Sequence, residues 1–305
     1  MKNAIKVLCF TLAVLIVGTS AFIYYFKWGK TDFEYIDGTD KGTVIITSYS
    51  GDSKNIIIPD RIRGKKVQQI DSMAFAETDI TSVTIGDNVT YLGKSAFRSC
   101  KSLKSVKFGK SLLSIDEACF MGCSALESVV LPESVETLGS SVFANCSALK
   151  SVEFESDKNF VVRDGVIFTS DMKTIVGALQ YANFGDYVCP DTVTSIQPFS
   201  FYGCKTLTGF TFSKNMIAIP QGLFALCTGL KELTVPDNIT QIGSALTTES
   251  GVKRITIPSS VRAIDKAAFI NSDGKAASDF VIRTTAGSKA ETFAKENSIK
   301  TEIIK

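Results

Sequence analysis

A phenylalanine that returns every 23 residues is the feature that most limits how this chain can fold. Phe97, Phe120 and Phe143 keep this step, and a cysteine three residues after each of them repeats it. A leucine three residues after each cysteine does the same, and the pattern resumes at Phe201 and Phe224. A fixed period of roughly 20–50 residues indicates a solenoid, in which each repeat is one coil that buries its apolar side on its neighbours.

Each coil contains one clear strand. Val106, Lys107 and Phe108 alternate between apolar and polar, which is typical of a strand with one face buried. Proline cannot extend a ladder, and it ends the equivalent strand in several other coils. A short helical turn is then expected around the phenylalanine. The sequence predicts a curved, right-handed solenoid with a parallel β-sheet on its concave face. The prolines are Pro59, Pro132, Pro190, Pro236 and Pro258.

Composition narrows the function classes. The 305 residues include no histidine, which removes the commonest general base and metal ligand. Ser–His and Cys–His nucleophile pairs are therefore impossible, and no metal or cofactor is expected. The formal charge of +2 comes from scattered basic and acidic residues and gives no indication of nucleic-acid binding.

The first 30 residues are not expected to belong to the solenoid. Lys2 and Lys6 precede an uncharged, largely apolar stretch from Val7 to Phe26, which is long enough to span a bilayer. Thr19-Ser20-Ala21 offers a cleavage site for a signal peptide, whereas the apolar residues beyond it favour an uncleaved anchor. Both alternatives export the rest of the chain, so the expected location is the cell surface, either membrane-anchored or secreted.

Five of the eight cysteines occupy one equivalent position in successive coils. A residue repeated at one place in every turn is better explained as a small buried filler than as a disulfide partner. We therefore predict a ladder of buried free thiols. These cysteines are Cys100, Cys123, Cys146, Cys204 and Cys227.

The segment from Leu126 to Cys146 resembles the leucine-rich repeats of the BspA type, also called Treponema pallidum-type repeats. Its strand, proline, glycine, Ala-Phe-like and cysteine positions agree with those repeats, and the resemblance extends from about Ile56 to Ile270. Such repeats occur on surface proteins of bacteria and some parasitic protists. The resemblance therefore implies extracellular matrix proteins or other surface proteins as ligands.

The expected organisation has four parts. Residues 1–30 form the signal peptide or anchor with its flank, and residues 31–55 form an N-terminal β-hairpin cap. Residues 56–278 form the solenoid, and residues 279–305 form a C-terminal cap. Within this last part, Ser288 followed by Glu291 predicts a capping box at the start of a helix.

An irregular insertion at residues 155–186 breaks the period. Phe160–Arg163 and Val166–Phe168 read as two strands around Asp164-Gly165, which is a hairpin signal. Two interpretations remain open. The insertion widens one coil, or it protrudes and serves binding.

Candidate site residues come from the outward positions of the strands, because the sequence contains no catalytic pattern. The carboxylate pairs Asp32/Glu34, Asp37/Asp40 and Glu153/Glu155 are interpreted as solvated surface charge. The outward side chains are small or singly charged and offer few aromatic or arginine anchors. A solvated surface without a partner is the competing interpretation. The candidate binding residues are Thr84, Lys107, Val130, Glu153, Thr211, Thr234 and Thr256.

Two functions remain at this point, and neither is enzymatic. The first is a surface-displayed protein-binding or adhesion module, with extracellular or envelope proteins, such as host matrix proteins, as partners. The second is a structural or spacer protein of the cell envelope without a tight ligand. Membrane contact is expected through the N-terminal segment, and no nucleic-acid partner is expected.

Overall fold

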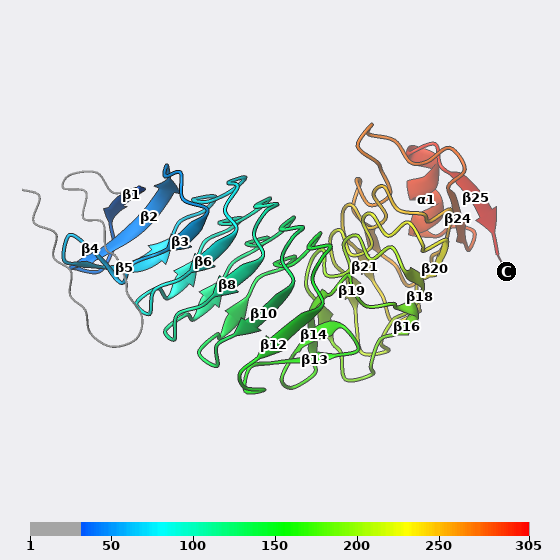
Figure 1. The fold of residues 1–305 in the computed structure, drawn as a ribbon. Helices are drawn as coiled ribbons and strands as arrows, with labels where there is room; N and C mark the ends of the chain where they lie inside the picture. Colours follow the sequence, from blue (N-terminus) through cyan, green and yellow to red (C-terminus); the bar gives the residue numbers. More distant parts are fainter. Residues whose placement is uncertain (1–31, 305) are drawn as a thin grey trace, which may run out of the picture. The chain divides into compact units, whose positions relative to one another are not determined.

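A computed structural model describes residues 32–304, and the compact unit within it begins at Phe33 (Figure 1). The predicted signal peptide or anchor lies outside the described residues. Within the described range, no helix combines the length and apolar character needed to cross a bilayer. The rest of this subsection concerns the compact unit alone.

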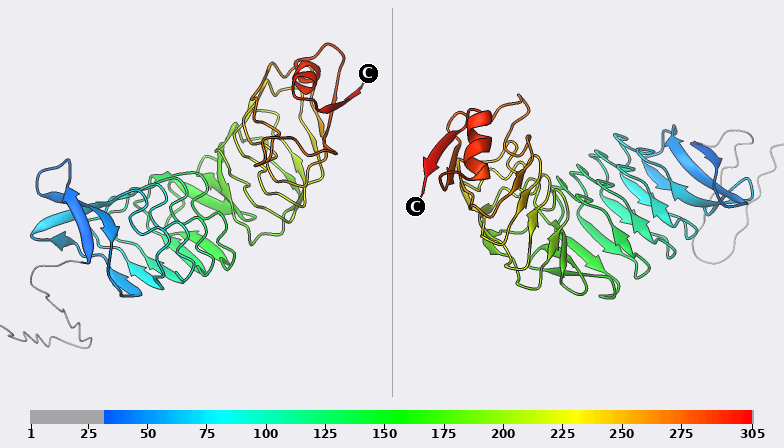
Figure 2. Two further views of the ribbon diagram at one scale, coloured as in Figure 1. Left: turned by 90° about the horizontal axis from the view of Figure 1, so that it is seen from above. Right: turned by 180° about the vertical axis from the view of Figure 1, so that it is seen from behind.

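Stacked coils place their longer strands in one row, which we call the strand face (Figures 1 and 2). Neighbouring strands of this row pair in parallel in four separate ladders. The predicted leucine-rich-repeat solenoid is confirmed. The strands are β3 (Asn55–Ile57), β6 (Ser82–Thr84), β8 (Ser105–Lys107), β10 (Ser128–Leu131), β12 (Ser151–Phe154), β16 (Gly185–Val188), β18 (Leu207–Thr211), β20 (Glu232–Thr234), β22 (Arg254–Thr256), β24 (Val281–Thr284) and β25 (Lys300–Ile303).

A second set of strands, mostly two residues long, follows the polar stretch of each coil. It begins with the antiparallel pair β1 and β2, and β4 joins β5 as a short hairpin. The remaining strands pair in parallel between neighbouring coils. They are β1 (Phe33–Asp37), β2 (Thr43–Tyr49), β4 (Arg61–Ile62), β5 (Lys65–Ile70), β7 (Tyr91–Leu92), β9 (Ser114–Ile115), β11 (Thr137–Leu138), β17 (Ser195–Ile196), β19 (Ala218–Ile219), β21 (Gln241–Ile242) and β23 (Ala263–Ile264).

The phenylalanine stripe is a stacked spine in the core, as predicted. The rings of Phe97 and Phe120 lie nearly parallel, with centroids 5.2 Å apart and an interplanar angle of 4°. Phe75 extends the stack on one side and Phe143 on the other. Aromatic rings at this spacing add to the burial energy of each coil on the next.

The short helical turn predicted around each phenylalanine is wrong. Ser95 and Ser99, two residues before and after Phe97, both have φ of 58°. Ala118 and Gly122 flank Phe120 in the same way, with φ of 56° and 79°. Left-handed residues interrupt a right-handed helix, so the chain turns sharply on both sides of the ring instead.

The insertion contains the predicted hairpin and one further strand. β13 (Phe160–Arg163) and β14 (Val166–Thr169) are antiparallel, and Asp164 and Gly165 both have positive φ, which suits a two-residue hairpin turn. β15 (Thr174–Ala178) pairs with β14 and then, in parallel, with β17.

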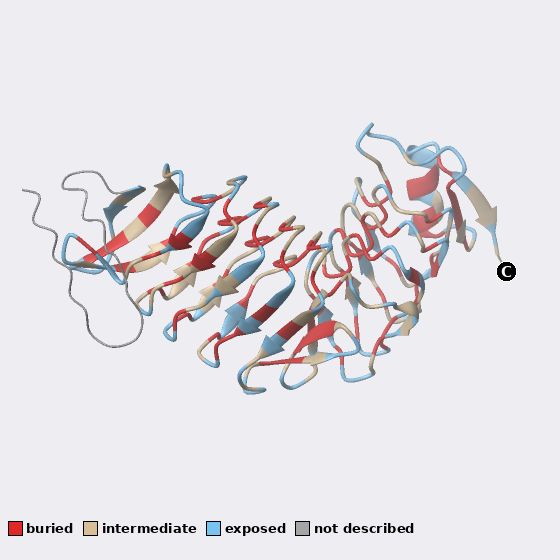
Figure 3. Cartoon of the chain, viewed as in Figure 1, coloured by how far each residue is buried: buried red, intermediate tan, exposed pale blue. Residues whose placement is uncertain are grey.

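The insertion packs into the molecule: β14 is largely buried, and β13 and β15 each bury two residues beside it (Figure 3). Val166, Ile167 and Phe168 are all buried, although successive residues of a strand point to opposite faces. Ile167 belongs to the apolar cluster of the N-terminal coils, whereas Val166 and Phe168 belong to that of the C-terminal coils. The strands β13–β15 therefore form a partition that divides the apolar core into two clusters.

Helix α1 (Lys289–Glu296) follows β24 and buries Ala290, Phe293 and Ala294. The predicted capping box is present, because the Ser288 hydroxyl accepts a hydrogen bond from the backbone N–H of Glu291. The Glu291 carboxylate in turn accepts one from the backbone N–H of Gly287, one residue before the N-cap. The helix covers apolar side chains next to β24.

Candidate binding surface

The predicted outward residues of the N-terminal coils form a row in register. Thr84 pairs with Lys107 across β6 and β8, and Val130 pairs with Glu153 across β10 and β12. Ile57 extends the row at β3, opposite Thr84. The row is exposed at Lys107, Val130 and Glu153, and Thr84 is half-buried.

The C-terminal coils repeat this arrangement. Thr211 pairs with Val188, and Thr234 pairs with Thr256. Thr256 is half-buried and is followed in register by Arg283 of β24. All seven predicted positions therefore lie on strands of the strand face, in two stretches separated by the insertion.

Two apolar members of the row were missed from the sequence. Val188 is 66% exposed and Ile57 is 57% exposed, compared with 50% for Val130. The alternation rule would have found both, because each is the last residue of its strand and is followed by a buried residue. Together they make the strand face more apolar than the predicted threonines suggest.

An exposed tyrosine lies near this face at the insertion. Burial raises the pKa of Tyr181, and the negative charge of Glu153 raises it further, so the phenol lies within electrostatic reach of that carboxylate. Tyr181 remains 42% exposed. Sequence reasoning missed it because it belongs to the irregular segment, whose path the period does not define.

Ion pairs between neighbouring coils neutralise much of the charge on the C-terminal strands. Arg254 pairs with Glu232, and Arg283 pairs with Glu302 at 3.5 Å. Exposed pairs of this kind contribute little to stability, about 0–1 kcal/mol each. The strand face therefore presents little net charge there.

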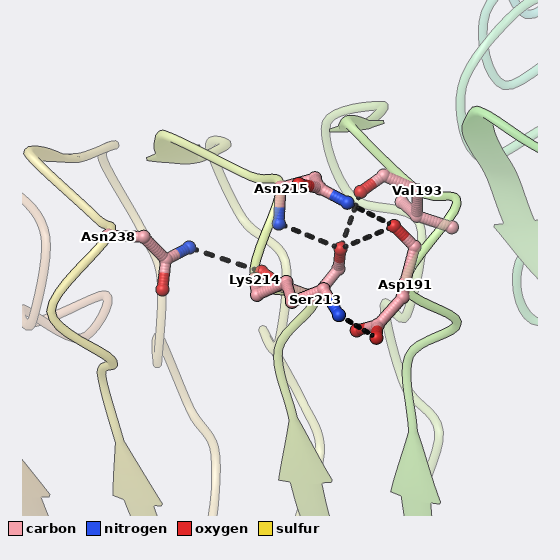
Figure 4. Close-up of polar contacts among 6 residues, drawn as sticks. All are labelled: Asp191, Val193, Ser213, Lys214, Asn215 and Asn238. Atoms are coloured by element: carbon pink, nitrogen blue, oxygen red, sulfur yellow. Dashed lines mark hydrogen bonds and ion pairs between the residues drawn. The ribbon is translucent and has the colours of Figure 1, made fainter.

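A separate set of polar side chains connects neighbouring coils at the turn that follows β18 (Figure 4). Ser213 is fully buried, and its hydroxyl donates to the Val193 carbonyl at 2.6 Å while accepting from the Asn215 backbone N–H at 3.1 Å. The Asn215 side chain donates to the Asp191 carbonyl at 2.6 Å. Asn238 bonds the Ser213 carbonyl from the following coil. These groups satisfy one another, so they serve structure.

The predicted burial of the cysteine ladder is confirmed for all five positions. Burial raises the pKa of Cys227 to about 12 and that of Cys204 well above its ordinary value. These two thiols stay protonated, which makes them poor nucleophiles and metal ligands. All five thiols of the ladder are buried in the core.

The carboxylates singled out in the sequence do not gather around a common point. Asp37 pairs with Lys65, and Asp40 accepts a hydrogen bond from Gln68. Glu155 accepts one from the backbone N–H of Glu133. Among residues 32–304, no group of three acidic, cysteine or histidine side chains could hold a metal ion.

The space at the boundary between the two apolar clusters is too small for a ligand. A cavity of about 20 Å³ lies between Phe143, Ile167, Val176 and Phe199. This volume holds about one water molecule. The external strand face is thus the better candidate surface.

Comparison with known proteins places these features in context. The model of the BspA type leucine rich repeat region matches residues 48–173 and 176–275, in six copies. No curated protein matches the chain.

Several solved structures are similar to this chain, and those with TM-scores above 0.5 share its fold. The pneumococcal vaccine antigen PcpA is 18% identical, with 90% of this chain and 98% of that chain covered and a TM-score of 0.57. A leucine-rich repeat protein from Eubacterium ventriosum is 19% identical, with coverage of 81% and 74% and a TM-score of 0.57. A leucine-rich repeat protein from T. pallidum is 23% identical, with coverage of 72% and 86% and a TM-score of 0.44. Likeness at these identities concerns the fold alone.

Proposed function

This chain belongs to the BspA-type leucine-rich repeat family, and from that premise we propose that it is an exported protein-binding module. Its partners are extracellular or envelope proteins, and its contact surface is the strand face. The N-terminal apolar segment exports the solenoid and either anchors or releases it at the cell surface. The proposed contact residues are Thr84, Lys107, Val130, Glu153, Thr211, Thr234 and Thr256.

The in-register row of outward side chains is the observation that carries this proposal. Hydrogen-bonded strands hold Val130 opposite Glu153 and Thr84 opposite Lys107. The backbone of such a rigid frame loses little conformational entropy on binding, which favours recognition. The exposed apolar side chains within the row supply area that water can leave on contact.

Affinity should be spread along the row rather than concentrated at one point. Tyr181 is the side chain near this surface that best suits an anchor, since tryptophan, tyrosine and arginine dominate strong interfaces. The threonines offer small contacts and hydrogen bonds. We therefore expect a modest contribution from each coil.

The test measures binding of the full chain to a panel of purified extracellular matrix and envelope proteins by surface plasmon resonance. Val130→Asp and Glu153→Lys alter the strand face. Ile217→Asp is the matched control, because Ile217 is 69% exposed just before β19, away from the strand face. The two face variants should weaken binding several-fold, and the control should not.

Two outcomes would contradict the proposal. Equal loss in Ile217→Asp and Val130→Asp would place the contact elsewhere or show a nonspecific apolar effect. Absence of binding to every member of the panel would favour the spacer function. Protease treatment of intact cells tests export separately, because a displayed solenoid is cut and an internal one is protected.

A further inference from the structure

A polar groove lies at the N-terminal end of the solenoid, away from the strand-face row. Its volume is about 410 Å³, which falls in the range of about 300–1,000 Å³ typical of small-molecule sites. The turn between β1 and β2 and the β4–β5 hairpin contribute to its walls. The charged and amide side chains of the lining are Asp40, Lys41, Arg61, Lys66, Gln68 and Asn88.

Three cationic side chains line this groove without an acidic partner. Lys41, Arg61 and Lys66 make no ion pair within residues 32–304, whereas the adjacent Lys65 pairs with Asp37. Arg61 donates one hydrogen bond to the Gly64 carbonyl at 2.7 Å. Its remaining N–H groups leave capacity for an anion, since a guanidinium carries five donors.

The acidic residue of the lining is already engaged. The Asp40 carboxylate accepts a hydrogen bond from the Gln68 side-chain Nε2 at 2.7 Å. The three cations outnumber this single carboxylate, so the lining carries a net positive charge.

Gln68 also carries an unmet acceptor. Its Oε1 is buried and has no hydrogen-bond partner in the described part of the chain. The amide cannot rotate to give Oε1 a partner without breaking the hydrogen bond from Nε2 to Asp40. The Oε1 atom is closed off from solvent, so Gln68 holds the Asp40 carboxylate in place rather than meeting a ligand.

We propose that this groove binds an acidic saccharide, a ligand whose rings carry hydroxyl donors together with carboxylate or sulfate groups. The anionic groups pair with Lys41, Arg61 and Lys66, and the ring hydroxyls bond to polar side chains of the lining, such as Asn88 and Ser111. All lining residues are polar, charged or glycine, so an apolar ligand would gain little there. This site is distinct from the proposed strand-face contact.

The experiment uses isothermal titration calorimetry on the full chain with defined tetrasaccharides. Tetragalacturonate supplies hydroxyls with carboxylates, and a heparin-derived tetrasaccharide supplies hydroxyls with sulfates. Maltotetraose supplies hydroxyls without charge, and inorganic sulfate supplies charge without hydroxyls. At least one acidic tetrasaccharide should bind about tenfold tighter than both maltotetraose and sulfate, because charge-assisted hydrogen bonds are stronger than neutral ones.

Variants assign the site. The triple variant Lys41→Gln, Arg61→Gln, Lys66→Gln should lose about tenfold or more of that affinity. Lys65→Gln, which removes a neighbouring charge that is not part of the lining, should change it less than about twofold. Gln68→Leu should reduce binding of the acidic tetrasaccharide, because it releases the Asp40 carboxylate beside the three cations. Circular dichroism melts verify that each variant is folded.

The proposal is overturned if neither acidic tetrasaccharide binds tighter than maltotetraose and sulfate. It is also overturned if the triple variant binds as the parent does, or if Lys65→Gln loses as much as the triple variant. Because the strand-face variants lie outside the groove, their protein binding can fail or succeed independently of this result.

Discussion

The Cys123 thiol donates a hydrogen bond to the carbonyl oxygen of Phe97, 3.1 Å away in the preceding coil. Cys146 makes the same contact with the Phe120 carbonyl, also at 3.1 Å. Cys227 makes it with the Phe201 carbonyl at 3.0 Å. Each thiol is therefore both a small apolar filler and a weak donor, which explains why one side chain recurs at this position.

Alkaline pH should destabilise the protein partly through these thiols. Burial raises the folded-state pKa of Cys227 from 9.0 to about 12, so the folded state keeps a proton that the unfolded state releases. The stabilising effect is complete below about pH 9, and it is lost as the pH rises from about 9 to about 12. The unfolding free energy, measured in urea from pH 8 to 11, should fall.

Cys227→Ala provides the comparison for this measurement. The variant lacks the titrating thiol, so its unfolding free energy should fall less steeply over the same pH interval. Parallel pH profiles for the parent and the variant would show that the thiol keeps an ordinary pKa in the folded state and is not buried.

Removing one ring from the spine should be costly. Phe120 is fully buried between Phe97 and Phe143, so Phe120→Ala leaves a cavity that the neighbouring coils cannot close. We expect a loss of about 3–5 kcal/mol in the free energy of unfolding, measured in denaturant melts. Tyr181→Ala, at an exposed ring, is the control and should cost much less. A loss below about 1 kcal/mol for Phe120→Ala would contradict its place in the spine.

The repeat pattern predicted the parts of the fold that depend on burial. The spine around Phe120, the thiol at Cys123 and the hairpin at Asp164-Gly165 all follow from period, residue size and turn chemistry. The left-handed residues beside Phe97 did not follow, because serine carries no signal for positive φ as glycine does.

Features formed by distant segments were also beyond the sequence. β15 is a short apolar strand, and nothing in Thr174–Ala178 reveals that it pairs with β14 on one side and β17 on the other. The groove near Gln68 joins a turn, a hairpin and later loops, which only the folded coils bring together. For the strand face, alternation located the outward positions, whereas Tyr181 needed the path of the insertion.

The polar connections between coils should contribute measurably to stability. The Asn238 side chain donates to the Met216 carbonyl at 2.6 Å and to the Ser213 carbonyl at 3.1 Å. Asn238→Ala would leave both carbonyls without this donor, so we expect a loss of about 1–3 kcal/mol in denaturant melts. The adjacent exposed Asp237→Ala is the control and should change stability by less than about 0.5 kcal/mol. Equal effects of the two changes would show that the contact is not formed.

Because β13–β15 divide the core, we expect the N-terminal coils and the C-terminal coils to unfold partly independently of each other. Across this partition, regular backbone ladders are replaced by side-chain contacts, such as Gln197 Nε2 to the Leu138 carbonyl at 3.3 Å and the Ser141 hydroxyl to the Phe199 carbonyl at 3.3 Å. β11 and β12 are end strands of their ladders on this side. Solenoid stability is a sum of repeat and interface contributions, so a weaker interface permits separate unfolding.

Two phenylalanines of the partition test this directly, because they face opposite clusters. Phe160 packs on Phe154 of β12 in the N-terminal cluster, and Phe168 belongs to the C-terminal cluster. Phe160→Ala should lower native-state hydrogen-exchange protection mainly in β10 and β12, and Phe168→Ala mainly in β16 and β18. Each should cost about 3–5 kcal/mol in the affected half, because each removes a buried ring. If both variants lower protection equally throughout residues 33–304, the coils unfold as one cooperative unit and the partition does not separate them.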